Sequence, residues 1–232
     1  MNKVLITGGA GFVGTALIKR LLEKYPTIEI VSIDNYSSGC KSNHIKSKQV
    51  TYIVKDTQNL IPKNFDASNT KSDIADVFEP EVVFHFGEFS RIVTSFDGFD
   101  NCWDYNMQGT KMVLDYCISK KAKLIYSASS SKFGNDGKDE NLSPYAWMKA
   151  KMVELINNYA DWFDLKFEIT YFYNAYGPGQ VRTGDYATVL GIFEEQYANG
   201  EPLTVVEPGK QSRDFTHIND IVSGVVLAAE KG

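Results

Sequence analysis

The chain has 232 residues, of which 43% are hydrophobic and 23% are charged, and its formal net charge at pH 7 is −5. This length and composition fit one folded domain with at most a small additional part, and they exclude a disordered chain. The negative net charge argues against nucleic acid as the main partner. No apolar run approaches the roughly 18 residues that a membrane-spanning helix requires, so no membrane partner is expected.

The spacing of cysteines and histidines favours a reduced, metal-free protein. Cys40, Cys102 and Cys117 are widely separated and form no Cys-x-x-Cys pair, so free thiols are expected. The three histidines lack the spacing of metal ligands, and we predict no metal. The first strand-like run begins at residue 3, which leaves no room for a signal peptide, and a cytoplasmic location is expected.

Apolar runs that are typical of buried strands alternate with helical patterns along most of the chain. The predicted strands cover residues 3–7, 28–33, 50–54, 81–86, 122–128 and 167–173. The predicted helices cover residues 11–24, 70–79, 97–119, 144–163, 185–199 and 217–231. This alternation predicts an α/β fold with a doubly wound parallel sheet, whose ligands bind beyond the carboxyl ends of the strands.

A glycine-rich turn lies between the first predicted strand and the first predicted helix. Such a turn lets the backbone approach a pyrophosphate closely, and the helix N-terminus offers it unpaired N–H groups. Glycine-rich turns are common, so this pattern is weak by itself. The second predicted strand, however, ends at Asp34, twenty residues after Gly14, where a carboxylate accepts hydrogen bonds from an adenosine ribose. We therefore predict a dinucleotide site that includes Gly8, Gly11, Phe12, Val13 and Gly14.

Asp34 also bears on the choice of dinucleotide. A carboxylate at this position repels a 2′-phosphate, and no Arg or Lys follows within five residues, so NAD is predicted rather than NADP. The simpler alternative is that Asp34 only begins the turn that follows it. With the glycine turn, the alternation predicts a Rossmann-type domain over 1–173. The density of Gly and Pro rises after residue 174, which predicts a smaller substrate-binding part over 174–232, interleaved with the last sheet elements.

A serine-rich strand end is followed by a helix that carries Tyr145 and Lys149. The fifth predicted strand leads into Ser129, and Ser143-Pro144 is a favourable helix start. Tyr145 and Lys149 are one helical turn apart and therefore share a face. A phenol ionises at about pH 10, so a tyrosine acts as a base at neutral pH only with positive charge nearby, such as a lysine and an oxidised nicotinamide.

This arrangement predicts the oxidation of a carbinol carbon. Removal of hydride requires the alcohol proton to leave, for which Tyr145 is the predicted base, while Ser129 hydrogen-bonds the reacting oxygen. Each part also has a simpler explanation, because a tyrosine and a lysine at this spacing often form an amphipathic pair and consecutive serines often form a polar turn. The order of the features, with the glycine turn and Asp34 before the serines and the tyrosine-lysine pair, favours catalysis.

The motifs resemble, over nearly the whole chain, those of the extended short-chain dehydrogenase/reductase family in its NAD-dependent nucleotide-sugar epimerase/dehydratase branch. They are residues 7–14 (TGGAGFVG), 34–35 (DN), 54–57 (VKDT), 83–87 (VFHFG), 106–110 (NMQGT), 145–149 (YAWMK), 174–179 (NAYGPG) and 213–217 (RDFTH). The resemblance implies cofactor contacts for Asn35, Asp56, Thr57, Phe86, Gly87, Tyr145 and Lys149. It also implies that Asn174 contacts a sugar nucleotide, that Arg213 meets its diphosphate, and that Ser129 is catalytic.

Two departures from the family pattern bear on the reaction. Dehydratases of this family eliminate water with an Asp-Glu pair, and this chain has Ser130 and Ser131 at those positions. Glu88 stands where the family usually has alanine, with Ser90 and Arg91 shortly after it. Glu88 and Arg91 are expected at the pocket mouth, where they mark either an unusual sugar or an internal ion pair. We place Ser90, Arg91 and Ser130 among the substrate-binding residues.

The sequence thus predicts an NAD-dependent nucleotide-sugar epimerase that acts through a transient 4-keto sugar. The alternatives are a 4,6-dehydratase and a non-catalytic dinucleotide sensor, which would not need the catalytic set. Relatives continue beyond residue 232, so the C-terminal substrate-binding part is expected to be incomplete. The resemblance also implies a homodimer through the helices predicted at 97–119 and 144–163, although their apolar residues would equally cover the sheet.

Overall fold

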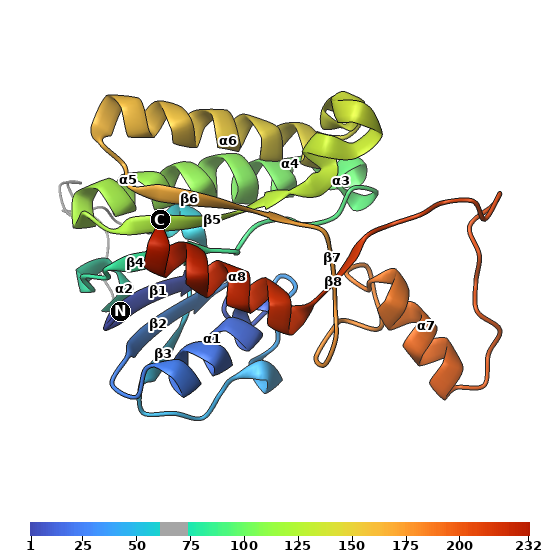
Figure 1. Ribbon diagram of the computed structural model, residues 1–232, viewed down its shortest axis with the longest axis horizontal. Coiled ribbons are helices and arrows are strands. Elements are labelled where there is room, and N and C mark those ends of the chain that lie inside the picture. Colours follow the sequence, from blue (N-terminus) through green and yellow to red (C-terminus); the bar gives the residue numbers. More distant parts are fainter. Residues whose placement is uncertain (61–73) are drawn as a thin grey trace.

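The computed structural model describes residues 1–60 and 74–232, and its centre is a parallel six-stranded sheet with the order β3-β2-β1-β4-β5-β6 (Figure 1). The strands are β1 (Lys3–Thr7), β2 (Glu29–Asp34), β3 (Val50–Val54), β4 (Val82–His85), β5 (Lys123–Ser129) and β6 (Phe167–Phe172). The doubly wound sheet predicted from the sequence is therefore confirmed. Asp34 and Ser129 are the last residues of their strands, at the carboxyl edge of the sheet where ligands bind.

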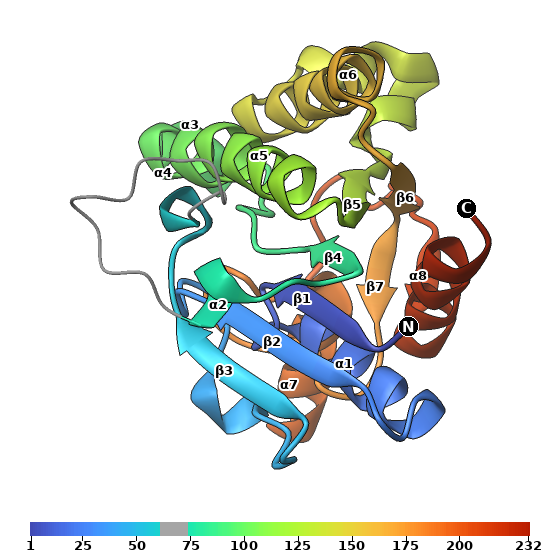
Figure 2. The ribbon, with the colours of Figure 1, turned by 90° about the vertical axis from the view of Figure 1, so that its left-hand side faces the viewer.

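Helices cover both faces of the sheet (Figure 2). On one face α1 (Phe12–Lys24) and α8 (Ile218–Lys231) share a buried cluster with β1, and on the other α5 (Thr110–Lys120) and α6 (Pro144–Phe163) do so. The first cluster contains Val4, Ile6, Leu17, Leu21, Ile221 and Val225. The second contains Leu5, Val113, Leu114, Met152 and Ile156. Burial of these apolar side chains on both faces explains why the strands read as nearly continuous apolar runs.

The helix predicted over 97–119 is interrupted in the structure. It consists of α3 (Thr94–Asp97), α4 (Phe99–Trp103), a π-helical segment (Asp104–Gly109) and α5. Gly98 leaves the helical conformation between α3 and α4, with φ −102° and ψ 37°. Within the π-helical segment, the Asn106 side chain exchanges two hydrogen bonds with the backbone of Phe89, at 2.7 and 3.0 Å. This long-range contact, which the helical pattern does not encode, accompanies the local widening of the helix.

The C-terminal elements differ most from the prediction. The helix predicted over 185–199 is shorter, because α7 (Val189–Ala198) begins after Thr188, whose hydroxyl caps it by accepting from the Gly191 N–H. The helix predicted over 70–79 begins outside the described residues, which exclude 70–73. Within the described residues, it corresponds to α2 (Ile74–Val77). Two short parallel strands, β7 (Asn174–Tyr176) and β8 (Phe215–His217), were not predicted.

The last helix returns from β8 to the central sheet, where its apolar face packs beside α1 (Figure 1). Residues of α8 therefore contribute to the same buried cluster as β1 and α1. The division at residue 173 itself stays a prediction. Among the helices in the described ranges, none combines the length and apolar character needed to cross a lipid bilayer.

Candidate active site

Two close backbone approaches shape the glycine turn between β1 and α1. Gly8 has a φ of +71°, and a Cβ there would lie 2.8 Å from the backbone nitrogen of Gly87. A Cβ on Gly14 would lie 2.2 Å from the carbonyl oxygen of Gly8. Both positions therefore require glycine, and the turn lies directly against the segment that follows β4.

The first turn of α1 follows the glycine turn without a side-chain cap. Its N-cap residue is Gly11, which has no side chain, and its N–H donates to the Gly8 carbonyl at 3.1 Å. Phe12 and Val13 are half-buried in the turn that follows. The positive end of this helix is thus not neutralised by a capping side chain, which suits an anionic group.

The Asp34 carboxylate lies beside the glycine turn and is only 8% exposed. Its two oxygens accept from the backbone N–H groups of Ala10 at 2.9 Å and of Tyr36 at 2.8 Å. Asp34 therefore does begin a turn, as the simpler explanation expected. It also lies next to the glycine turn, as the ribose-binding prediction requires.

Three further predicted cofactor residues lie at the ends of β2 and β3. The Asn35 side-chain amide donates to the Asp56 carboxylate at 2.7 Å, which joins the two strand ends. Thr57 follows Asp56, is buried, and begins a short 3-10 helix (Thr57–Asn59). The structure therefore brings these predicted residues together at one edge of the sheet.

The segment after β4 is bound to the end of β1. The N–H groups of Phe86 and Gly87 both donate to the Thr7 hydroxyl oxygen, at 3.0 and 2.8 Å. Thr7 is fully buried. This contact fixes the two predicted residues next to the glycine turn.

The N-terminal turn of α6 forms as predicted. The Ser143 hydroxyl accepts from the Ala146 N–H at 3.1 Å, and Pro144 is the first helical residue. The backbone N–H of Tyr145 lies 3.3 Å from the Ser95 hydroxyl of α3, and its side chain is half-buried beside Met148. This helix start therefore lies against α3, which presents Tyr145 at the carboxyl edge of the sheet.

Lys149 attaches α6 to β5. Its buried ammonium donates to the backbone carbonyl of Ser127 at 2.5 Å, and it lies 3.4 Å from the Tyr126 hydroxyl and 4.6 Å from the centre of that ring. Among the described residues, no hydrogen bond connects the Tyr145 hydroxyl to Lys149 or Ser129. The Tyr145 phenol is nevertheless close enough to help raise the pKa of Tyr126, for which burial is the main cause.

Glu88 lies inside the protein, and the prediction that it lies at the pocket mouth is wrong. Only 3% of its side chain is exposed, and its carboxylate forms an ion pair with Lys149. It also accepts from the hydroxyls of Tyr126 at 2.9 Å and Thr110 at 3.1 Å. Of the two explanations that the sequence left open, the structure supports the internal ion pair, with Lys149 and not Arg91 as the partner.

Ser129 ends β5 two residues after Ser127. Its hydroxyl oxygen accepts from the backbone N–H of Ser131 at 3.2 Å and from the Ser131 hydroxyl at 2.9 Å. The half-buried Ser130 begins the 3-10 segment Ser130–Asn141. The serines therefore form a polar turn, as the simpler explanation expected. Because Ser129 is the acceptor in both bonds, its own hydroxyl hydrogen is not used by either of them.

Arg91 joins the segment after β4 to the loop before α7, whereas Ser90 is exposed. The Arg91 guanidinium donates to the backbone carbonyl of Tyr186 and lies 5.8 Å from the centre of its ring. Burial lowers the pKa of Arg91, and the phenols of Tyr145 and Tyr186 raise it. The predicted substrate residue Arg91 therefore lies near the predicted base Tyr145.

Asn174 is the first residue of β7, and Arg213 lies two residues before β8. The Asn174 side chain donates to the Asp214 carbonyl at 2.9 Å, and the exposed Arg213 donates to its neighbour, the Ser212 carbonyl, at 2.7 Å. Within the part of the chain that the structure describes, no hydrogen bond or ion pair connects either residue to Tyr145 or Lys149. Their substrate-binding roles stay predictions.

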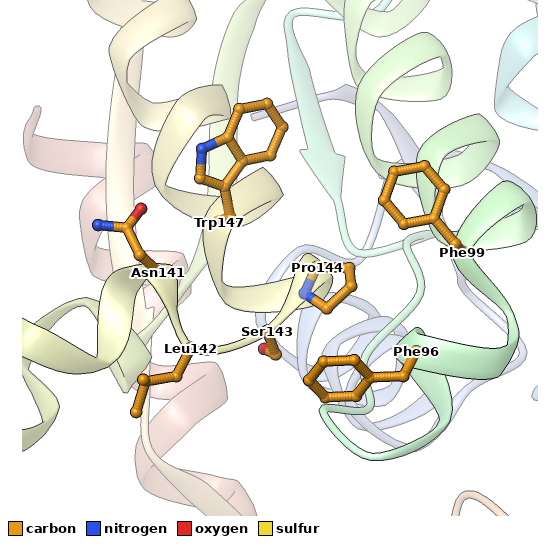
Figure 3. A pocket seen from close by; sticks show the side chains of 7 residues that line it. All are labelled: Phe96, Phe99, Asn141, Leu142, Ser143, Pro144 and Trp147. Carbon is orange, nitrogen blue, oxygen red and sulfur yellow. The ribbon is translucent and has the colours of Figure 1, made fainter.

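An open surface hollow of about 270 Å³ lies beside the start of α6 (Figure 3). Its lining is mainly apolar and consists of Phe96, Phe99, Asn141, Leu142, Ser143, Pro144 and Trp147. Neither Tyr145 nor Lys149 lines it, so this hollow is separate from the predicted catalytic residues. Among residues 1–60 and 74–232, no group of three or more His, Cys, Asp and Glu side chains is arranged as a metal site.

The described residues fit a dinucleotide. The glycine turn has no room for a Cβ at Gly8 or Gly14, the α1 N-terminus has no capping side chain, and Asp34 lies beside both. These features suit a pyrophosphate and an adenosine ribose, and Lys149 contacts the carboxyl end of β5, which is separated from β1 by β4. The nicotinamide half would then extend toward Tyr145 and Lys149.

Two related protein sequences and one solved structure match nearly the whole chain. A protein of Bacillus subtilis described as an uncharacterized UDP-glucose epimerase is 29% identical over 99% of this chain and 73% of its own length. The dTDP-D-glucose 4,6-dehydratase of Dictyostelium discoideum is 27% identical over 100% of this chain and 56% of its own length. The solved structure of the UDP-glucose 4-epimerase of Thermotoga maritima with UDP-glucose is 26% identical, has a TM-score of 0.86, and is matched over 99% of this chain and 74% of that one.

Residues 4–232 also match the model of the NAD dependent epimerase/dehydratase family. That match includes every motif on which the resemblance in the sequence was based, from the glycine turn to the RDFTH segment. NAD is accordingly the cofactor of this family, and the cofactor prediction is confirmed at that level. The chain belongs to the NAD-dependent epimerase/dehydratase family of nucleotide-sugar enzymes.

Proposed function

We propose that this protein is a nucleotide-sugar epimerase that inverts a carbinol centre through a transient 4-keto sugar. The observation that carries the proposal is the bond from Lys149 to the Ser127 carbonyl, because it holds the helix of Tyr145 against the strand end of Ser129. The relatives described as UDP-glucose epimerases support a nucleotide sugar as the substrate.

In this proposal the protein moves one proton while NAD, when bound, accepts and returns a hydride. Tyr145 takes the proton from the C4 hydroxyl as the C–H bond at C4 breaks, and Ser129 donates a hydrogen bond to the same oxygen. The keto sugar then turns in the pocket. When hydride returns to the other face of C4, Tyr145 returns the proton to the oxygen, so the product is an isomer and no net oxidation occurs.

A 4,6-dehydratase is the second candidate, supported by the Dictyostelium relative that matches the whole chain. Its elimination step needs an acid and a base in addition to Tyr145. Ser130 and Ser131 stand at the two positions, and serine hydroxyls do not titrate near neutral pH. The Glu88 carboxylate is bound to Lys149, Tyr126 and Thr110, which opposes its use as that acid. These observations favour the epimerase.

Mass spectrometry of products from a panel of nucleotide sugars tests the proposal. An epimerase gives a product of unchanged mass with altered stereochemistry, which proton NMR of the sugar ring resolves. Loss of one water from the product would establish the dehydratase instead. Bound NAD with no product and no substrate-dependent change in nicotinamide absorbance would support the third candidate, a non-catalytic sensor.

We further propose a homodimer formed through α4 and the adjoining start of α6. Most apolar residues of α5 and α6, such as Val113 and Met152, are buried against the protein's own sheet. Phe99 and Trp103 on α4, in contrast, are 46% and 37% exposed, and their rings stack 6.2 Å apart. Together with the apolar lining of the hollow in Figure 3, they form an exposed apolar area of the kind that marks an interface.

A further inference from the structure

A buried polar chain connects Lys149 with the glycine turn through Glu88. The carboxylate of Glu88 is divided between two sets of donors, since one oxygen faces Lys149 and the other accepts from Thr110 and Tyr126. Both members of the ion pair are almost fully buried, with 6% of the Lys149 side chain and 3% of the Glu88 side chain exposed. Such a pair holds its geometry firmly, because breaking it would leave a buried charge without a partner.

The chain continues from Thr110 to His85 and Thr7. Thr7 already accepts from two backbone N–H groups, so its hydroxyl donates to Nδ1 of His85 at 2.7 Å. Nε2 of His85 therefore carries the hydrogen and donates to the Thr110 hydroxyl at 2.9 Å, and Thr110 donates in turn to Glu88. Burial lowers the pKa of His85 to about 4, so the ring is neutral at pH 7 and keeps this tautomer.

We propose that Glu88 is a positioning residue: it holds the Lys149 ammonium at the nicotinamide end of the cofactor site. Lys149 and Tyr145 lie at the reacting centre, whereas Asp34 and the glycine turn lie at the adenosine and pyrophosphate end. Glu88 therefore acts on the nicotinamide half of NAD through Lys149. The expected effect of Glu88 on turnover rests on the proposed function. The expected effect on NADH affinity does not, because it requires only the NAD site of the family.

Binding of NADH and of ADP to the full chain tests this inference. In Glu88→Gln the Lys149 ammonium keeps its hydrogen bond to the Ser127 carbonyl but loses its anionic partner. NADH should therefore bind about tenfold more weakly. ADP occupies only the adenosine and pyrophosphate end, so its affinity should stay within about twofold. The matched control is Asp115→Asn, because Asp115 likewise accepts from a lysine and a tyrosine, Lys111 and Tyr159, on the outer side of α5 and α6. That variant should change neither affinity.

A double-mutant cycle with Lys149→Met shows whether Glu88 acts through Lys149. In the Lys149→Met background, Glu88→Gln should change NADH affinity by less than about twofold. The inference is overturned if Glu88→Gln leaves NADH affinity unchanged, if it weakens ADP as much as NADH, or if its effect persists without Lys149. If Lys149→Met does not fold, the affinities of Glu88→Gln for NADH and for ADP are enough to test the positioning role.

The kinetic consequence separates this inference from the proposed function. If the protein turns over a nucleotide sugar, Glu88→Gln should lower kcat while the KM for the sugar stays nearly constant, since Glu88 makes no substrate contact in this proposal. If the wild-type protein turns over no nucleotide sugar, the proposed function fails, while the affinities for NADH and ADP still decide the role of Glu88. A rise in KM with unchanged kcat would instead overturn the positioning role.

Discussion

The ammonium of Lys149 and the backbone carbonyl of Ser127 lie 2.5 Å apart, which attaches α6 to the last residues of β5. Tyr145 lies one helical turn before Lys149, so the same contact holds the first turns of its helix against the end of β5. The helix that carries the predicted catalytic pair is thus attached to the carboxyl end of β5.

Replacement of Tyr145 by Phe should abolish turnover with little change in cofactor affinity. The variant removes only the hydroxyl that is proposed to take and return the substrate proton, so the rate should fall by about 10²- to 10⁴-fold. NADH titration of the same variant should give a dissociation constant close to that of the wild type. A variant that keeps the full rate would show that the assigned base is wrong.

Replacement of Gly8 by Ala should destabilise the fold and weaken NAD binding. A Cβ there would lie 2.8 Å from the Gly87 nitrogen, and the φ of +71° is unfavourable for alanine, so the free energy of unfolding should fall by about 1–3 kcal/mol. The matched control is Gly184→Ala, since Gly184 has a φ of +78° with no atom within 4 Å of an added Cβ. Chemical denaturation should show a smaller loss for the control, and equal losses would contradict the close approach to Gly87.

Replacement of Asp34 by Asn should reduce the preference for NADH over NADPH. In the predicted ribose site the carboxylate would repel a 2′-phosphate, and the amide keeps one oxygen that can accept hydrogen bonds while removing the charge. The ratio of the two dissociation constants should fall by about tenfold, which corresponds to the loss of one charged interaction. This ratio is insensitive to general unfolding, and an unchanged ratio would show that Asp34 does not face the ribose.

His85 should make the fold less stable as the pH falls from 7 to 5. Burial lowers its pKa to about 4, whereas a histidine in an unfolded chain has a pKa of about 6.5. Below pH 6.5 the unfolded state therefore binds a proton that the folded state rejects, which costs about 2 kcal/mol of unfolding free energy at pH 5. Denaturation at pH 7 and pH 5 should show a smaller decrease in the free energy of unfolding for His85→Gln than for the wild type. The control variant, His217→Gln, should show the same decrease as the wild type.

Replacement of Trp103 by Glu should convert the proposed homodimer into a monomer. Trp103 stacks with Phe99 on the exposed face of α4, and a carboxylate there would be buried without a partner in a dimer. Light scattering at micromolar concentration measures the mass. The control is Val205→Glu, at an exposed apolar position outside the helices. A wild-type protein that is already monomeric would refute the dimer.

Much of the architecture is encoded in short stretches of the sequence. The six strands of the sheet, the glycine turn and the start of α6 at Ser143 and Pro144 all occur where local patterns predicted them, because apolar periodicity and capping chemistry act over a few residues. The interrupted helix around Asn106 was not predicted. There the Asn106 side chain accepts from the backbone of Phe89, 17 residues away, a contact that no local pattern records.

By itself, then, the sequence determined the fold class, the order of the elements and the residue types that meet at the sheet edge. Only the tertiary structure decided that Glu88 is the partner of Lys149, 61 residues away, and that β7 pairs with β8. It also decided the neutral state of His85, whose lowered pKa comes from burial. The physical reason is that backbone conformation depends mainly on near neighbours, whereas burial and the partner of a charge depend on which distant segments fold against it.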